Sequence, residues 1–193
     1  GKITMPTMFK ITKKGILYVF AIGIVCQCIF NIAYMGSISM VGASMAAVLL
    51  YVSPVFVAIF SKIVYKEKIN KIKILSLIFC VIGAFLAVTG GKIEIQGLNI
   101  IGILAGIISA ITYAMLPIFN KNALKEMDNI TMSAYAFLIA AIIMCFRVNP
   151  IHTISKIDNM RILMYILAIG IIPTAMSYIV YSKGILKGVE LSI

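Results

Sequence analysis

Residues 15–35 read GILYVFAIGIVCQCIFNIAYM, an apolar run of 21 residues without a charged side chain. A helix needs about 20 mostly apolar residues to cross the hydrocarbon core of a bilayer, which is roughly 30 Å thick. The run therefore predicts a transmembrane helix, and five similar runs follow it along the chain. The six predicted spans cover approximately residues 14–36, 41–65, 72–90, 99–120, 130–147 and 161–186.

The composition of the whole chain agrees with this pattern. Of its 193 residues, 62% are hydrophobic and 12% are charged, whereas soluble domains are roughly half apolar and a quarter charged. The sequence therefore predicts an all-α, polytopic membrane protein. A net charge of +11 would suggest a nucleic-acid partner for a soluble protein, but here the lysines lie at the ends of apolar runs. We expect the lipid bilayer as a partner and no nucleic acid.

The basic residues also predict the orientation of the spans. If the spans alternate in direction, 13 of the 17 Lys and Arg side chains fall on the side of Lys14, and the other four are Lys92, Arg147, Lys156 and Arg161. Basic loops tend to stay in the cytoplasm. The Lys-rich loops are therefore expected to be cytoplasmic, in a multi-pass protein of the cell membrane.

The first and the sixth predicted spans resemble each other. A shift of 147 residues aligns YVFAIGI at residues 18–24 with YILAIGI at residues 165–171, without a gap. Isoleucine matches are expected by chance in such a sequence, but the matched Tyr and Gly positions are more informative. Since five crossings separate the two spans, they traverse the membrane in opposite directions, as in the inverted repeats of many transporters.

The shift of 147 residues between equivalent spans predicts the domain organisation. Residues 1–97 are expected to hold the last three helices of a first five-helix repeat, and residues 98–193 the first three helices of a second repeat and the start of its fourth. On this interpretation the chain is truncated at both ends and covers approximately helices 3 to 8 of ten.

The two matched spans carry polar side chains along one face. Gly23, Gln27, Asn31 and Tyr34 are spaced by four, four and three residues, which places them on one side of a helix. Their equivalents in the sixth span are Gly170, Thr174, Tyr178 and Tyr181. Polar groups in hydrocarbon need partners or water. We expect the two stripes to line a shared solute cavity, and hydrogen bonding between helices is the alternative.

Prolines interrupt three of the predicted spans. Tyr51 and Pro54 lie near the middle of the second, Pro117 lies in the fourth and Pro173 in the sixth. Proline removes a helix hydrogen bond and clashes with the preceding turn, so a kink or break is expected at each position. Such breaks serve as hinges or ligand sites in transporters, but they also occur for structural reasons alone.

Small residues predict where helices pack closely. Gly102 and Gly106 in the fourth span have the spacing at which two helices approach each other, and Ser109 and Tyr113 continue that face as candidates for the cavity. Gly83 and Ala87 form a further small-residue face, which predicts close packing and offers a place for a homodimer contact.

The sequence contains no indication of catalysis, a cofactor or a metal site. Its six acids are scattered, whereas a membrane enzyme of prenyl or phosphoryl transfer usually pairs acids around Mg²⁺. The four cysteines lack the spacing of metal ligands, and the single histidine, His152, lies in a polar connection. We therefore expect a protein that is not an enzyme.

Three segments resemble a known family. Residues 44–69, SMAAVLLYVSPVFVAIFSKIVYKEKI, resemble the fourth-helix signature of EamA-like permeases in the drug/metabolite transporter superfamily. Residues 101–121, IGILAGIISAITYAMLPIFNK, resemble the opening helix of that family's second repeat, and residues 168–185, AIGIIPTAMSYIVYSKGI, resemble its eighth helix. One departure is Lys66, which stands where the family often has a glycine before the glutamate.

The resemblance implies a ten-helix fold of two five-helix repeats, with both termini in the cytoplasm and a central cavity. Its helices 1, 3, 4, 6, 8 and 9 are expected to line that cavity. In this sequence the implied cavity residues are Gln27, Asn31, Tyr34, Tyr51, Pro54, Ser109, Tyr113, Thr174, Tyr178 and Tyr181.

The expected function is that of a permease for a small-molecule solute, an exporter of amino acids or related compounds that works by alternating access. Two alternatives stay open. The first is a membrane scaffold or partner subunit whose polar stripes only join helices. The second is a membrane enzyme that acts on lipid-linked substrates.

Overall fold

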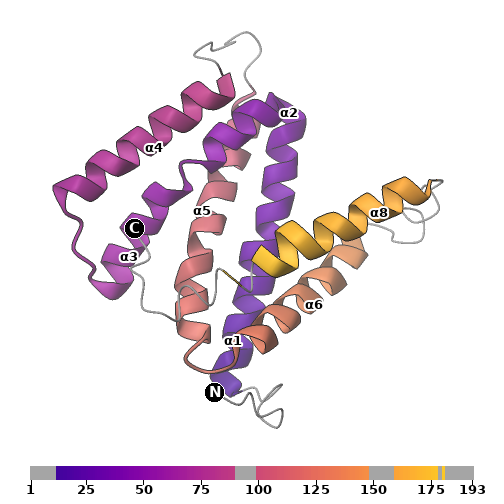
Figure 1. Ribbon diagram of the computed structural model, residues 1–193. Coiled ribbons are helices and arrows are strands. Elements are labelled where there is room, and N and C mark those ends of the chain that lie inside the picture. Colours follow the sequence, from indigo (N-terminus) through magenta and orange to yellow (C-terminus); the bar gives the residue numbers. More distant parts are fainter. Residues whose placement is uncertain (1–11, 90–98, 148–158, 178–179, 181–193) are drawn as a thin grey trace. The chain divides into compact units, whose positions relative to one another are not determined.

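The computed structural model describes residues 12–89, 99–147, 159–177 and 180, and all regular structure in these ranges is helical (Figure 1). The elements are α1 (Lys13–Ala21), the π-helix η2 (Ile22–Ile29), α2 (Phe30–Leu50), α3 (Ser53–Tyr65), α4 (Lys71–Thr89), α5 (Ile100–Ala123), α6 (Asn129–Arg147), α8 (Met160–Ile169) and the π-helix η3 (Gly170–Met176).

Three helical runs of the described residues are long and apolar enough to span a membrane: Lys13–Leu50, Ile100–Ala123 and Asn129–Arg147. Two shorter apolar helices, Ser53–Tyr65 and Met160–Ile172, accompany them. The all-α, polytopic membrane fold predicted from the composition is confirmed.

The sequence predicted a connection between the first two spans at residues 37–40, and this prediction is wrong. The helical run continues through these residues to Leu50, and its backbone departs from helical geometry at Gly42, where φ is 82° and ψ is 159°. Residues 36–41 contain no proline or charge, and the Ser39 hydroxyl donates to the Gly36 carbonyl at 2.8 Å. Only glycine adopts this φ without strain, so the change of direction of the α2 ribbon falls at Gly42 (Figure 1).

The break predicted at Pro54 is confirmed. α2 ends at Leu50, two turn residues follow, and α3 starts at Ser53 with Pro54 in its first turn. A proline is tolerated there because the first amides of a helix have no partner within that helix. Pro117, in contrast, lies inside α5, which continues to Ala123.

Polar side chains just before the helices fix several helix starts. In each case a side-chain oxygen accepts a hydrogen bond from a backbone N–H two or three residues ahead, at distances from 2.8 to 3.3 Å, which satisfies an amide at the open end of the helix. These capping residues are Thr12, Asn70, Asn99, Asp128 and Asn159.

The chain divides into two compact units, each described here by itself. Among the described residues, one unit contains α1, α6, α8 and η3, and the other contains α2, α3, α4 and most of α5. This division by packing differs from the predicted repeats at residues 1–97 and 98–193, which are defined by sequence equivalence. The repeat boundary stays a prediction.

In the first unit, α1 packs against α6, and Gly23 continues this contact. A Cβ atom at Gly23 would lie 3.0 Å from the Ala136 carbonyl oxygen and 3.0 Å from the Ile139 side chain. Gly23 therefore permits close helix packing, while the polar members of its stripe lie further along the helix. The hydroxyl of Thr12 donates to Glu126 at 2.9 Å, which ties the start of α1 to the segment before α6.

In the second unit, α5 packs against α2 through the two glycines singled out in the sequence. A Cβ at Gly102 would lie 2.6 Å from the Cβ of Met40, and one at Gly106 would lie 2.4 Å from a methyl group of Leu49 and 2.9 Å from the Ser37 hydroxyl. The predicted close packing is confirmed. At Gly83 on α4, in contrast, no atom of the described residues lies within 4 Å of an added Cβ, so the close packing expected there is not seen.

Replacing Gly106 by Ala should lower the free energy of unfolding by about 1–3 kcal/mol, because the added methyl group forces Leu49 and Ser37 apart from α5. The matched control is Gly83→Ala, which adds the same methyl group to an exposed helix face. It should raise the free energy by up to about 1 kcal/mol through helix propensity. Unfolding in detergent micelles measures both, and equal effects of the two substitutions would contradict the packing.

At the end of α3, Lys66 has a backbone conformation that is unusual for lysine. Lys66 has φ 56° and ψ 29°, the left-handed conformation, and its N–H donates to the Ser61 carbonyl. A left-handed conformation costs an L-residue roughly 1–2 kcal/mol but glycine almost nothing. Glycine is therefore the residue expected at this position on physical grounds, and the lysine here is strained.

Lys66→Gly should raise the melting temperature by about 2–4 °C, since relief of strain exceeds the added flexibility of the unfolded chain. Lys68→Gly removes the same charge at a position without positive φ and should lower the melting temperature. A thermal unfolding series in detergent distinguishes the two; a fall for both variants would show that the conformation of Lys66 costs little.

Candidate functional site

The first polar stripe crosses from η2 into α2. Gln27, Asn31 and Tyr34 are half-buried, whereas Ile32 and Met35 beside them are exposed. The three stripe residues are therefore less exposed than these two neighbours. The solute cavity that the sequence predicts along this stripe stays a prediction.

Asn31 is held by the backbone of the preceding turn. Its side-chain nitrogen donates to the Gln27 carbonyl at 2.7 Å. Among the described residues, its side-chain oxygen accepts no hydrogen bond. The hydrogen bond restrains the amide, and its oxygen keeps the capacity to accept from another donor.

An aromatic cluster joins the stripe to α5. The rings of Phe30 and Tyr34 stack with centroids 5.6 Å apart and an interplanar angle of 9°. The ring of Tyr113 lies against Phe30 at 5.4 Å with an angle of 45°. Two predicted site residues from different helices thus meet at Phe30, and ring pairs at these distances are favourable.

Phe30 was missed in the sequence analysis, which considered only polar side chains. A signal was present, because Phe30 and Tyr34 are four residues apart and therefore neighbours on a helix surface. Phe30 also stands one position before Asn31, at the junction of η2 and α2.

Other predicted site residues lie elsewhere. Ser109 is fully buried, and its hydroxyl donates to the Gly106 carbonyl at 2.7 Å, so it serves its own helix. Tyr51 is half exposed at the break between α2 and α3, and Pro54 lies in the next turn. Neither takes part in the stacking around Phe30.

The second stripe is described only in part. The hydroxyl of Thr174 donates to the Ile169 carbonyl at 2.9 Å, five residues back. Tyr178 and Tyr181 lie outside the described residues.

The two stripes share an uncommon backbone feature. Adding 147 to the bounds of η2 gives residues 169–176, and η3 covers Gly170–Met176. π-Helices are rare and are found frequently at functional sites. The sequence equivalence of Gln27 and Thr174 therefore extends to the local conformation, although no residue pattern predicted a π-helix.

Asn120 is a buried polar residue that the sequence analysis overlooked. It is fully buried on α5, three residues after Pro117, and neither atom of its amide has a hydrogen-bond partner among the described residues. A buried amide without a partner is costly.

Asn120→Leu should raise the free energy of unfolding by about 1–3 kcal/mol, because the side chain keeps a similar size and loses an unpaired amide. Asn122→Leu, at a half-buried position two residues on, is the control and should change it little. Unfolding in detergent measures both. A clear destabilisation by Asn120→Leu would contradict the prediction and indicate a partner such as an ordered water.

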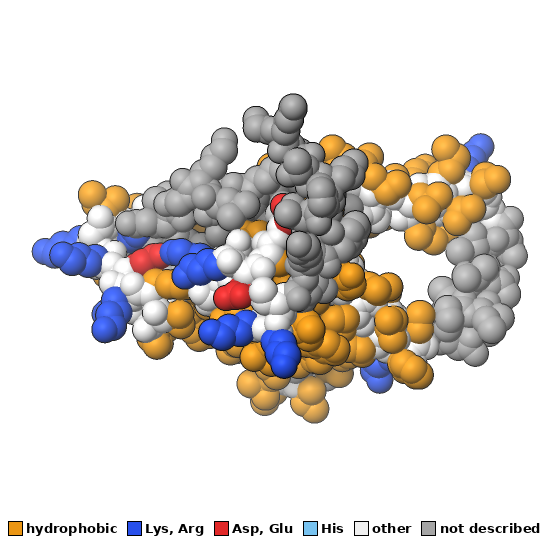
Figure 2. Space-filling model, turned by 90° about the horizontal axis from the view of Figure 1, so that it is seen from below, with side chains coloured by type: hydrophobic (Ala, Val, Ile, Leu, Met, Phe, Trp, Pro, Cys, Tyr) orange, Lys and Arg blue, Asp and Glu red, His pale blue; other side chains and the backbone are white. Residues whose placement is uncertain are grey.

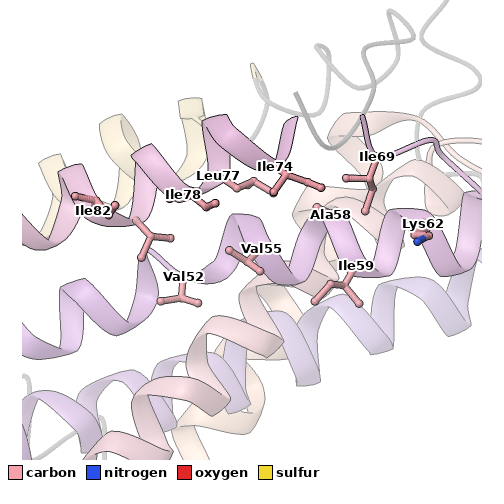
Figure 3. A pocket seen from close by; sticks show the side chains of 11 residues that line it. Val52, Val55, Ala58, Ile59, Lys62, Ile69, Ile74, Leu77, Ile78 and Ile82 are labelled. Atoms are coloured by element: carbon pink, nitrogen blue, oxygen red, sulfur yellow. The ribbon is translucent and has the colours of Figure 1, made fainter. Parts of the chain in front are cut away.

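A groove lies between α3 and α4 (Figure 3). Its volume is about 540 Å³, and aliphatic side chains form its walls together with the side chain of Lys62. None of the predicted cavity residues within the described ranges lines it.

The chemistry of the stripes is that of uncharged recognition. They offer amide and hydroxyl groups together with aromatic faces, which bind through hydrogen bonds, stacking and cation–π contacts. Across the described ranges, no group of three His, Cys, Asp or Glu side chains is placed to hold a metal ion.

Comparison with protein families gives a match over nearly the whole chain. The model of the EamA-like transporter family matches two segments, residues 3–89 and 100–188.

Several curated proteins are similar to this chain. A protein of Clostridium kluyveri described as an uncharacterized transporter is 25% identical over 180 residues, covering 89% of this chain and 57% of the relative. The uncharacterized transporter YoaV of Bacillus subtilis is 24% identical over 125 residues, covering 63% and 43%. An uncharacterized transporter of Archaeoglobus fulgidus is 27% identical over 158 residues, covering 79% and 52%.

The chain spans about half the length of these relatives. No solved structure matches it.

Proposed function

The chain belongs to the EamA-like transporter family, and on this premise we propose that it acts in a membrane permease that moves a small solute by alternating access. The observation that carries the proposal is the pair of equivalent π-helical segments, η2 and η3, each with a polar side chain at the same repeat position. Paired sites of this kind are typical of transporters built from inverted repeats.

The proposed solute path is lined by side chains from both repeats. Within it, Asn31 offers a fixed acceptor, and the cluster of Phe30, Tyr34 and Tyr113 offers aromatic faces and phenol groups. The full set of proposed cavity residues remains Gln27, Asn31, Tyr34, Tyr51, Pro54, Ser109, Tyr113, Thr174, Tyr178 and Tyr181.

An amino acid or a related compound is the proposed solute, and export is the proposed direction. Support comes from the uncharged donors and acceptors of the stripe, which suit a zwitterion better than a strongly charged solute. The Asn31 acceptor fits an ammonium group, and the aromatic rings fit its attached carbons. Phenol groups can donate to a carboxylate.

Local breaks in the helices support alternating access. η2 and η3 lack the regular α-helical hydrogen bonds, and α2 and α3 are separated by two turn residues, Tyr51 and Val52. Residues at such element ends absorb the changes in backbone angles that a rocking motion requires.

We place the permease in the cell membrane with its Lys-rich loops in the cytoplasm, on the argument of the 13 to four distribution of basic residues. We also propose a contact with a second copy of the chain at the face of Gly83 on α4, where no described residue lies within 4 Å of an added Cβ.

The test is counterflow of labelled amino acids into liposomes that carry the protein. Asn31→Ala should lower the flux by about tenfold, the effect of losing one hydrogen bond to a solute. Ile32→Ala, a change at the next and exposed position, is the matched control and should retain the flux.

Equal flux in the two variants would overturn the proposed cavity. If instead Asn31→Ala fails to assemble while no variant transports any solute, the scaffold hypothesis is favoured over the permease.

A further inference from the structure

The groove between α3 and α4 has the lining expected of a site for a hydrocarbon chain. Eleven side chains of the described residues line it, and all of these but Lys62 are aliphatic. Val55 and Ile59 line it from α3, and Leu77 and Ile78 line it from α4 (Figure 3). Its volume of about 540 Å³ falls in the range of about 300–1,000 Å³ typical of sites for small ligands.

One end of this groove is positively charged. Lys62 lies in the last turn of α3 and is exposed. Between residues 62 and 73 the only acid is Glu67, and Lys and Arg side chains gather at the end where α3 and α4 meet (Figure 2). The lysines of this cluster are Lys62, Lys66, Lys68, Lys71 and Lys73.

We propose that an anionic phospholipid of the surrounding bilayer occupies this groove, with one acyl chain between α3 and α4 and its phosphate at Lys62. The aliphatic walls match the acyl chain, and the lysine cluster matches the negative headgroup. Basic residues at the membrane surface attract anionic lipids in this way. The apolar groove that leads to Lys62 keeps the acyl chain of one such lipid in place.

Charge complementarity favours a lipid over a protein helix as the occupant. A helix that filled the groove would cover Lys62 and would have to supply an acid to it. A second copy of the chain would bring its own lysine cluster to the same surface. The bilayer, in contrast, supplies negative headgroups at the depth where the helices end.

The experiment uses a tryptophan reporter, because the sequence contains no Trp. Ile78→Trp places the reporter on the groove wall, and Phe79→Trp places it one position on, at a residue that is 64% exposed and does not line the groove. The full chain is reconstituted in vesicles of equal parts phosphatidylglycerol and phosphatidylcholine. In parallel samples, one or the other lipid carries bromine atoms in its acyl chains and quenches nearby Trp fluorescence.

Phosphatidylglycerol should bind in the groove with about fivefold higher affinity than phosphatidylcholine, the expected contribution of one lysine. Brominated phosphatidylglycerol should therefore quench the fluorescence of Ile78→Trp more strongly than brominated phosphatidylcholine. Lys62→Gln should remove this preference, whereas Lys14→Gln, a change at a lysine of α1, should retain it. At Phe79→Trp both lipids should quench equally. Val55→Trp, on the opposite wall, replaces the reporter if Ile78→Trp does not reconstitute.

Two results would overturn the proposal. Equal quenching by both lipids at the groove reporter would show ordinary fluid lipid, and quenching at Phe79→Trp but not at the groove reporter would show that protein fills the groove. Retention of the preference in Lys62→Gln would overturn the assignment of the headgroup.

Discussion

Inside a bilayer every backbone N–H and C=O must find its partner within the protein, because the hydrocarbon offers none. This constraint makes the described residues helical, and it gives meaning to the places where the helix is not regular. In η2 and η3 the hydrogen-bond ladder is altered, and side chains bond to the carbonyls there or next to them. Asn31 donates to Gln27, and Thr174 donates to Ile169. The polar stripes thus stabilise the backbone of the same segments that we propose to line the solute path.

A second consequence concerns how the helices approach each other. Apolar side chains gain little from meeting each other in lipid, so close packing of small residues supplies much of the attraction between helices. Gly102 and Gly106 let α5 lie against α2 at a distance that a Cβ atom would forbid. The same approach allows Tyr113 of α5 to reach Phe30. A packing feature of the glycines therefore positions an aromatic cluster of the candidate site.

Much of this architecture is encoded in patterns that sequence alone reveals. Apolar runs predicted the helices, Pro54 predicted the break between α2 and α3, and the two glycines predicted close packing. The change of direction at Gly42 was predicted at the wrong residues, because the neighbours of Gly42 are apolar and compatible with a helix. The π-helices, the stacking on Phe30 and the buried Asn120 depend on contacts between segments, which no local pattern reports. The groove likewise arises from the spacing of two helices rather than from either sequence.

The central claim is that the stripe on η2 and α2 faces a water-filled path through the membrane. It is tested most directly by cysteine accessibility, in a variant whose four native cysteines are replaced by alanine. Single cysteines are introduced at Asn31 and at Ile32, the half-buried stripe position and its exposed neighbour. In vesicles, a charged methanethiosulfonate reagent should modify the cysteine at position 31 quickly, and the cysteine at position 32 slowly because lipid covers it. Equal rates, or faster modification at position 32, would contradict the claim.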